Sequence, residues 1–164
     1  MPSTTTPDTL SVAQAIVSYG QGLVDNNNIQ IYAQVQMGEI RDVTNVLLAG
    51  NACLEIYANQ DDSQHFAFGG KIRDEQTWFL LSLVSLDDAQ AAEIHIYQIR
   101  DALVRPFQIH ATLGAIGSVY HAQIKANSGK FIKIFRNGQW FRAHLIEVMT
   151  RQEWYVPTPP GVIA

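Results

Sequence analysis

The dipeptide Asn137-Gly138 constrains the fold of this chain more than any other short segment. Asn-Gly supplies the positive φ values that a two-residue hairpin turn requires, and runs of bulky residues flank it on both sides. The dipeptide therefore predicts a β-hairpin over 130–154. A two-residue turn also fixes the register of the hairpin, so Lys133 is expected to lie directly opposite Arg142.

This register sorts the side chains of the hairpin onto two faces. One face is expected in the core, and it consists of Ile132, Ile134, Phe141 and Ala143. The other face carries aromatic residues and the pair Lys133 and Arg142, whose like charges cost stability when they lie opposite each other. Two explanations fit this pair. The long side chains spread apart in solvent, or they meet carboxylates of a neighbouring copy or DNA phosphate.

The clearest helical pattern lies between Asp88 and Val104. Its apolar residues recur at spacings of three and four, namely Ala89, Ala92, Ile96, Ile99 and Leu103. Ser85 or Asp87 would cap the helix, and Asp88 adds favourable negative charge to its first turn. Pro106 is expected to end the helix, because the residue before a proline is pushed out of the helical region.

The rest of the chain reads mainly as strands. A short helix is expected from Leu10 to Val24, before Gly20 and Gly22 weaken the pattern. The segment Ile29 to Met37 alternates with a period of two, which predicts a half-buried strand. Further strands are expected at 43–48, 52–58, 77–86 and 118–125, together with a hairpin over 65–72 that turns at Gly69-Gly70.

This order of elements predicts an α+β fold. We expect a single domain over 9–155, with a mostly antiparallel (mixed) β-sheet flanked by an N-terminal helix and one long central helix, and ending in a β-hairpin. Residues 1–8 and the proline-rich residues 156–164 are expected to be tails. No apolar run approaches the roughly 20 residues that cross a bilayer, and the N-terminus does not read as a secretory signal.

No constellation of residues in the chain indicates catalysis. The five histidines form no metal-binding spacing, and the single cysteine, Cys53, lies in a strand-like run typical of a buried structural thiol. The segment Asn127-Ser128-Gly129-Lys130 is not a phosphate loop, because position 124 is not glycine and Phe131 follows the lysine. The sequence therefore predicts a protein that is not an enzyme and that uses no metal or cofactor.

Charge is distributed unevenly along the chain. Through Asp101 there are 13 acidic and 4 basic residues, and after it 2 acidic and 7 basic, so the halves carry −9 and +5 and sum to −4. A protein with one acidic and one basic side can bind its own copies head to tail or turn the basic side toward phosphate. The basic interface or lumen candidates are Lys125, Lys130, Lys133, Arg136, Trp140, Arg142 and His144, and the acidic partner-surface candidates are Asp61, Asp62, Asp74 and Glu75.

The layout as a whole resembles a tailed-bacteriophage neck or tail-terminator protein. The features that carry this resemblance are the N-terminal helix, the strand block, Phe68-Gly69-Gly70-Lys71 before the strand 77–86, the helix from Asp87-Asp88 through Arg100-Asp101, and the final basic hairpin. The resemblance covers most of the chain and includes no single diagnostic motif.

The resemblance implies a structural virion protein used in tail completion and head-tail joining. Such proteins form a homo-oligomeric ring, commonly a hexamer, which caps the tail tube and joins it to the head connector without covalent chemistry. The implied partners are further copies of the chain, tail-tube and head-connector proteins, and DNA that passes through the lumen without sequence-specific contact. The implied location is the virion, assembled in the host cytoplasm, and no membrane is involved.

Two other classes of protein remain open. A small ligand-binding or regulatory α+β domain would need a pocket, which Trp78, Phe79, Trp140 and Phe141 would line. A nucleic-acid-binding module would use the basic hairpin 130–144, although a sequence pI near 5.6 argues against it.

Overall fold

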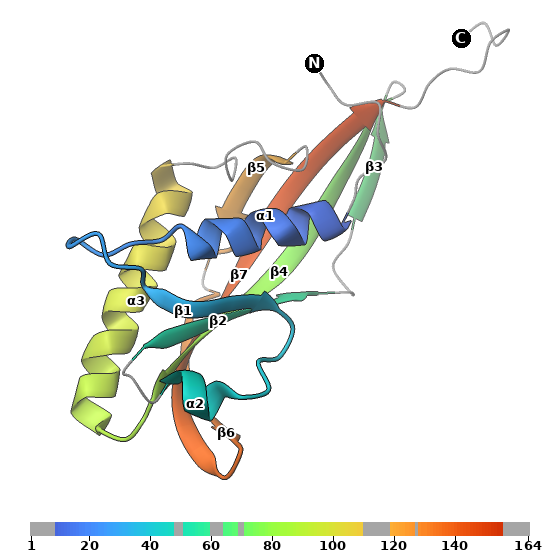
Figure 1. Ribbon diagram of the computed structural model, residues 1–164. Coiled ribbons are helices and arrows are strands. Elements are labelled where there is room, and N and C mark those ends of the chain that lie inside the picture. The colour runs from blue at the N-terminus through green and yellow to red at the C-terminus, as the bar shows by residue number, and fades with distance from the viewer. Residues whose placement is uncertain are drawn as a thin grey trace, which may run out of the picture.

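The computed structural model describes residues 9–47, 51–59, 64–68, 71–109, 119–126 and 128–155, and it confirms the α+β prediction (Figure 1). The elements are α1 (Thr9–Gln21), β1 (Tyr32–Met37), α2 (Val43–Leu47), β2 (Ala52–Ala58), β3 (Gln64–Phe68), β4 (Lys71–Ser85), α3 (Ala89–Ile109), β5 (Val119–Ile124), β6 (Lys130–Arg136) and β7 (Gln139–Tyr155). The expected tails, 1–8 and 156–164, lie outside the described residues.

The centre of the sheet is the antiparallel pair β4 and β7, which stay in register from Lys71 opposite Tyr155 to Ser85 opposite Phe141. β2 and β3 pair with different stretches of β4, and β6 and β5 pair with different stretches of β7. β1 joins β2 in parallel, which makes the sheet mixed. In Figure 1, β3 and the adjoining ends of β4 and β7 extend away from the helices.

The late hairpin forms as expected. Asn137 and Gly138 have φ values of 51° and 79°, and β6 pairs with β7 in the predicted register, with Lys133 opposite Arg142. The expected core face also holds, since Phe141 is fully buried and Ile134 packs against the same cluster. The local turn rule alone was therefore enough to place seven cross-strand pairs.

Side chains alternate across the sheet, so it has a core on each face. On one face, α1 and α3 cover residues such as Leu80 and Ile146. On the other face, α2 and the residues before it cover Leu83 and Phe141. Cys53 lies in this second core, and burial raises the pKa of its thiol to about 11, as expected for a structural cysteine.

The long helix α3 begins later and ends later than the sequence predicts. Asp88, rather than Ser85 or Asp87, caps it, because the Asp88 Oδ1 accepts hydrogen bonds of 3.0 Å from the backbone N–H groups of residues 90 and 91. The helix also continues through Pro106 to Ile109, so the predicted stop was wrong. Phe107 explains the extra turn, since it is buried and its ring centroid lies 4.6 Å from that of Tyr19 on α1.

Two predicted strands differ in the structure. The segment 43–48 is not a strand but contains the short helix α2, whose buried residues Val43 and Leu47 follow Ile40 at spacings of three and four. β1 begins at Tyr32 instead of Ile29, and an irregularity after Tyr32 breaks the simple alternation. Tyr32, expected on the polar face, is buried and its hydroxyl lies 2.8 Å from Ser82 Oγ, whereas Met37 is exposed.

α1 ends at Gln21, and Gly20 in its last turn allows close packing. A Cβ at Gly20 would lie 2.8 Å from Leu54 Cδ2. We expect Gly20→Ala to lower the free energy of unfolding by about 1 kcal/mol, because overpacking of about 1–3 kcal/mol outweighs a gain of about 1 kcal/mol in helix propensity. Urea denaturation measures the loss. Gly22→Ala, at an exposed position just past the helix, is the control and should be nearly neutral; equal stability of the two variants would contradict the packing argument.

None of the described helices is long and apolar enough to cross a membrane.

Candidate interaction surface

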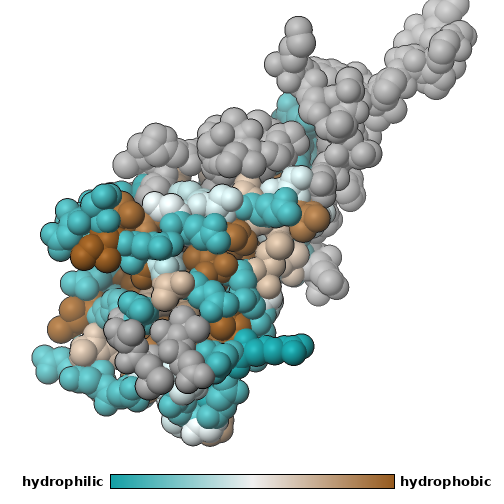
Figure 2. Space-filling view, viewed as in Figure 1, coloured by the Kyte–Doolittle hydropathy of each residue, from teal (hydrophilic) through white to brown (hydrophobic). Residues whose placement is uncertain are grey.

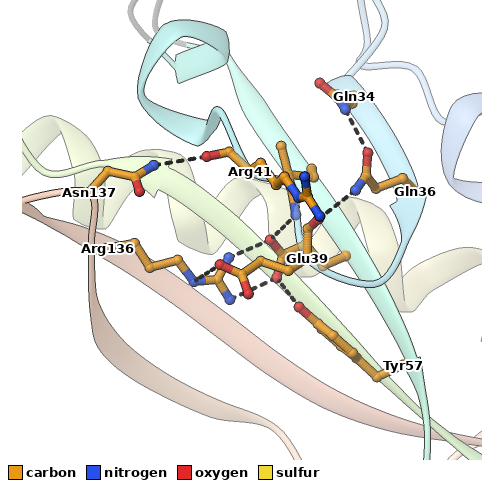
Figure 3. A network of polar contacts seen from close by, with 9 residues as sticks. Gln34, Gln36, Glu39, Arg41, Tyr57, Arg136 and Asn137 are labelled. Atoms are coloured by element: carbon orange, nitrogen blue, oxygen red, sulfur yellow. Dashed lines mark hydrogen bonds and ion pairs between the residues drawn. The ribbon is translucent and has the colours of Figure 1, made fainter.

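Arg136 does not point outward with the other basic residues of the hairpin. It lies on the core-side face of β6, where its guanidinium forms a two-pronged ion pair with Glu55 of β2 (Figure 3). One of these bonds, from Nη2 to Oε2, is 2.9 Å long. Glu55 is 0 % exposed, and it also accepts hydrogen bonds from the Ile40 backbone N–H at 2.9 Å and the Tyr57 hydroxyl at 2.6 Å. Both oxygens of the buried Glu55 carboxylate therefore accept hydrogen bonds.

Further hydrogen bonds join the hairpin turn to the segment between β1 and α2 and to α2 itself. The Asn137 side chain donates a 3.0 Å hydrogen bond to the Arg41 carbonyl, and Gln139 donates one of 3.1 Å to the Thr44 hydroxyl. Burial and the hydrogen bond to Glu55 raise the pKa of Tyr57 to about 12, and the bond to Glu55 raises the pKa of Arg136. Arg136, a sequence candidate for an interface or lumen, is therefore engaged inside the fold.

Arg142 is likewise engaged within its own chain. On the helix-covered face, Arg142 Nε lies 2.6 Å from Glu93 Oε1, and Arg142 Nη2 donates a 3.2 Å hydrogen bond to Glu93 Oε2. The Tyr97 hydroxyl and Arg142 lower the pKa of Glu93. A carboxylate of α3 thus offsets the like charges of Lys133 and Arg142, whereas the sequence suggested solvent or an outside partner. Lys133 remains exposed.

The other charged candidates are spread over the fold. Lys125 forms a 3.4 Å ion pair with Glu147, Glu75 forms a 2.6 Å ion pair with Arg151, and Asp74 is half-buried. Lys130 is exposed. Asp61 and Asp62 lie outside the described residues. The structure therefore does not gather the basic candidates into one patch. Three carboxylates of the acidic half pair with arginines of the basic half instead: Glu55 with Arg136, Glu75 with Arg151, and Glu93 with Arg142.

An exposed set of aromatic side chains remains on the outer face of the hairpin and the neighbouring part of α3. We call it the aromatic strip and define it as Tyr97, Phe131, Phe135 and Trp140. Phe135 and Trp140 are 57 % and 55 % exposed, and their ring centroids lie 5.2 Å apart. Tyr97 and Phe131 meet edge to face at 5.0 Å. Lys133 lies between Phe131 and Phe135 on the same face of β6.

Of the strip, the sequence singled out Trp140 as a candidate and also placed Phe131 and Phe135 on the outer face of the hairpin. It missed Tyr97, because a tyrosine on the polar side of a helix gives no signal until β6 is seen to lie beside it. His144, another candidate, is 1 % exposed and lies behind Phe131, with ring centroids 4.7 Å apart. Burial lowers the pKa of His144 to about 4, so the ring is neutral at pH 7.

The four residues suggested for a ligand pocket do not come together. Trp78 and Phe141 are buried on opposite faces of the sheet, and Trp78 Nε1 donates a 2.9 Å hydrogen bond to Thr150. Trp140 is exposed. Among the described residues, no group of three or more His, Cys, Asp or Glu side chains is placed to hold a metal ion. The exposed rings of the aromatic strip are suited instead to contact with the surface of another molecule.

Figure 2 shows one side of the molecule, on which hydrophilic residues are mixed with apolar ones over the described part of the surface. Comparison of the chain with protein families found no match, and neither did comparison with curated proteins.

Proposed function

We propose that this protein is a structural virion subunit, a tail terminator or neck protein that forms a homo-oligomeric ring, caps the phage tail tube and joins it to the head connector. The observation that carries the proposal is the aromatic strip. Soluble monomers rarely group exposed aromatic side chains, whereas aromatic residues dominate the binding energy of protein–protein interfaces. The role is one of assembly, without covalent chemistry and without a membrane.

A ring needs two different complementary surfaces on each subunit. β1 forms one edge of the sheet, and β6 lies on the far side of β7. On and next to β1 is a second set of exposed apolar residues, Val24, Ile29 and Met37. The exposed carboxylate of Asp25 accompanies this set, and exposed Lys133 lies within the strip. Glu39, next to β1, already lies 3.9 Å from Arg136 Nε of its own chain. Two different apolar surfaces that carry opposite charge fit a head-to-tail contact between copies.

The remaining partners follow from the ring. The tail-tube and head-connector proteins would contact its two ends, in a virion assembled in the host cytoplasm. DNA would pass through the lumen and meet exposed cations outside the aromatic strip, such as Lys130 at the start of β6.

The test is assembly of the purified chain, measured by native mass spectrometry and electron microscopy. We expect rings, and we expect the double variant Phe135→Ser, Trp140→Ser to be monomeric, because each aromatic anchor lost costs about 30-fold or more in affinity. Leu10→Ser is the control, since Leu10 is an equally exposed apolar residue on α1. A wild-type chain that stays monomeric at every concentration, with and without tail-tube protein, would refute the ring. Normal rings from the double variant would show that the strip is not its interface.

A ligand-binding or regulatory domain is the second candidate, and a hollow beneath α3 favours it. The nucleic-acid alternative has less support, because Arg136 and Arg142 are already paired with carboxylates of their own chain.

A further inference from the structure

Two strands of the sheet have an open edge. Among the described residues, β1 pairs only with β2, and β6 pairs only with β7. The same residues of β4 pair with both β2 and β7, so these two strands flank β4, and in the same way β4 and β6 flank β7. β1 and β6 are therefore the opposite edges of one stretch of sheet, ordered β1-β2-β4-β7-β6. An open edge presents backbone N–H and C=O groups that another chain can bind by adding a strand.

The hydrogen-bond pattern shows which backbone groups face each open edge. On β1, the Gly38 N–H donates a 2.9 Å hydrogen bond to the Ile56 carbonyl of β2. Successive residues of a strand direct their backbone groups to opposite sides, so the N–H of Met37 points away from β2. On β6, Arg136 lies next to the two-residue turn, where facing residues bond to each other. The same alternation then points the N–H of Lys133 away from β7.

The two edges match in level and in direction. The register of the sheet joins residues from both edges in one row across the strands, namely Val35, Leu54, Ser82, His144 and Phe131. β1 runs parallel to β2, and three antiparallel pairings lead from β2 to β6, so β6 runs opposite to β1. When a second copy continues the sheet of the first, β6 of one copy therefore meets β1 of the other as an antiparallel neighbour, the more stable kind of pair.

The residues of the two edges favour this pairing. Natural edge strands are usually protected by charged residues or proline. β1, with the sequence YAQVQM, has neither, and its one irregularity, after Tyr32, leaves Gln34 to Met37 in regular register. β6 carries the exposed cations Lys130 and Lys133, so two β6 edges would bring like charges together. The cationic edge therefore fits the uncharged edge of another copy better than it fits its own counterpart.

We propose that successive copies of this chain join by strand addition, in which β6 of one copy pairs antiparallel with β1 of the next. The sheet then continues from subunit to subunit. This inference rests on the proposed ring and adds to it a contact between main chains. The exposed side chains described above pack beside the junction, and the backbone hydrogen bonds fix its register.

Proline substitutions test the junction, because proline removes the backbone N–H and is tolerated on an edge where that N–H faces outward. Met37→Pro and Lys133→Pro should each weaken assembly at least tenfold more than Met37→Ala and Lys133→Ala, which lose the same side chain but keep the N–H. Native mass spectrometry over a dilution series measures the weakening, and circular dichroism checks that each monomer is folded. Proline variants that form rings as well as their alanine controls would overturn strand addition while the ring itself stands.

An equimolar mixture of the two proline variants identifies which edges pair. Each variant keeps one intact edge, so we expect the mixture to give a dimer of one Met37→Pro copy and one Lys133→Pro copy, and no rings. Either variant alone should stay monomeric. A dimer of two Lys133→Pro copies would show that β1 pairs with itself, and it would overturn the proposal.

Hydrogen exchange of the wild-type chain tests the same junction without any substitution. On ring formation, the amides of residues 32–38 and 130–136 should exchange at least tenfold more slowly, because pairing protects backbone N–H groups. β5 is the internal control, since it is an edge strand outside the junction and should exchange as before. Rings without added protection of β1 and β6 would overturn strand addition alone, whereas a chain that never assembles would refute both the ring and this inference.

Discussion

Arg136→Met is expected to lower the free energy of unfolding by about 3–5 kcal/mol. The substitution removes the positive charge that pairs with Glu55. The Glu55 carboxylate is 0 % exposed and would then keep only two neutral hydrogen-bond donors, the Ile40 N–H and the Tyr57 hydroxyl. A buried charge without a counter-charge is among the costliest defects a fold can carry. Urea denaturation followed by fluorescence measures the loss as a lower midpoint at an unchanged slope.

Two further variants make this test specific. Lys133→Met changes an exposed cation on the same strand and should alter stability by no more than about 0.5 kcal/mol. Adding Glu55→Gln to Arg136→Met should recover part of the loss, because the charge is gone while an amide oxygen can still accept from the Ile40 N–H. If Arg136→Met is no more destabilising than Lys133→Met, the ion pair contributes nothing to the fold.

Phe141→Ala is expected to cost about 3–5 kcal/mol as well, for a different reason. Phe141 is fully buried on β7 in the core that α2 covers, next to the last residues of β4. Truncation would leave a cavity among Leu83, Val43 and their neighbours, and an interior at packing density near 0.75 collapses only partly around such a gap. Thermal unfolding measured by calorimetry should show the loss as a markedly lower Tm.

Phe135→Ala is the matched control for this prediction. Phe135 lies on the same hairpin but on its outer face, and it is mostly exposed, so its removal should cost less than about 1 kcal/mol. Similar Tm shifts for the two variants would contradict the assignment of the two faces of the hairpin. The contrast also separates roles, because Phe135→Ala should weaken assembly while the subunit stays folded.

The sequence predicted features that depend on neighbouring residues, and it failed where contacts between residues far apart along the chain decide the structure. The hairpin register follows from two turn residues, and it was predicted correctly. The stripe of α3 follows from spacing, and four of its five predicted residues are in the core, whereas Ala89 is exposed. The segment 43–47 was too short for its period to distinguish a helix from a strand. Pro106 failed as a stop signal because packing of Phe107 outweighs a local preference, and no local rule includes that contact.

The ion pairs of Arg136 and Arg142 could not be predicted either, because their partners are distant in the sequence. Arg136 and Glu55 are 81 positions apart, and Arg142 and Glu93 are 49 apart. In sequence, each arginine appears as an unpaired cation in a stretch without carboxylates, which favours an outside partner. Only the placement of β2 and α3 around the hairpin reveals the internal partners. The aromatic strip was easier to predict, since Phe131, Phe135 and Trp140 follow from the register of the hairpin alone.

Because β4 pairs with β7, the central pair of strands in the sheet can form only late in translation. β4 is the innermost strand of the first half, yet its long partner is translated more than fifty residues later, after α3 and β5. Until then the nascent chain has an incomplete sheet with an open edge, the state most prone to aggregate. Its excess of carboxylates provides mutual repulsion between nascent chains during this interval. The arginines of β6 and β7 neutralise part of that charge at the moment when β7 closes the sheet.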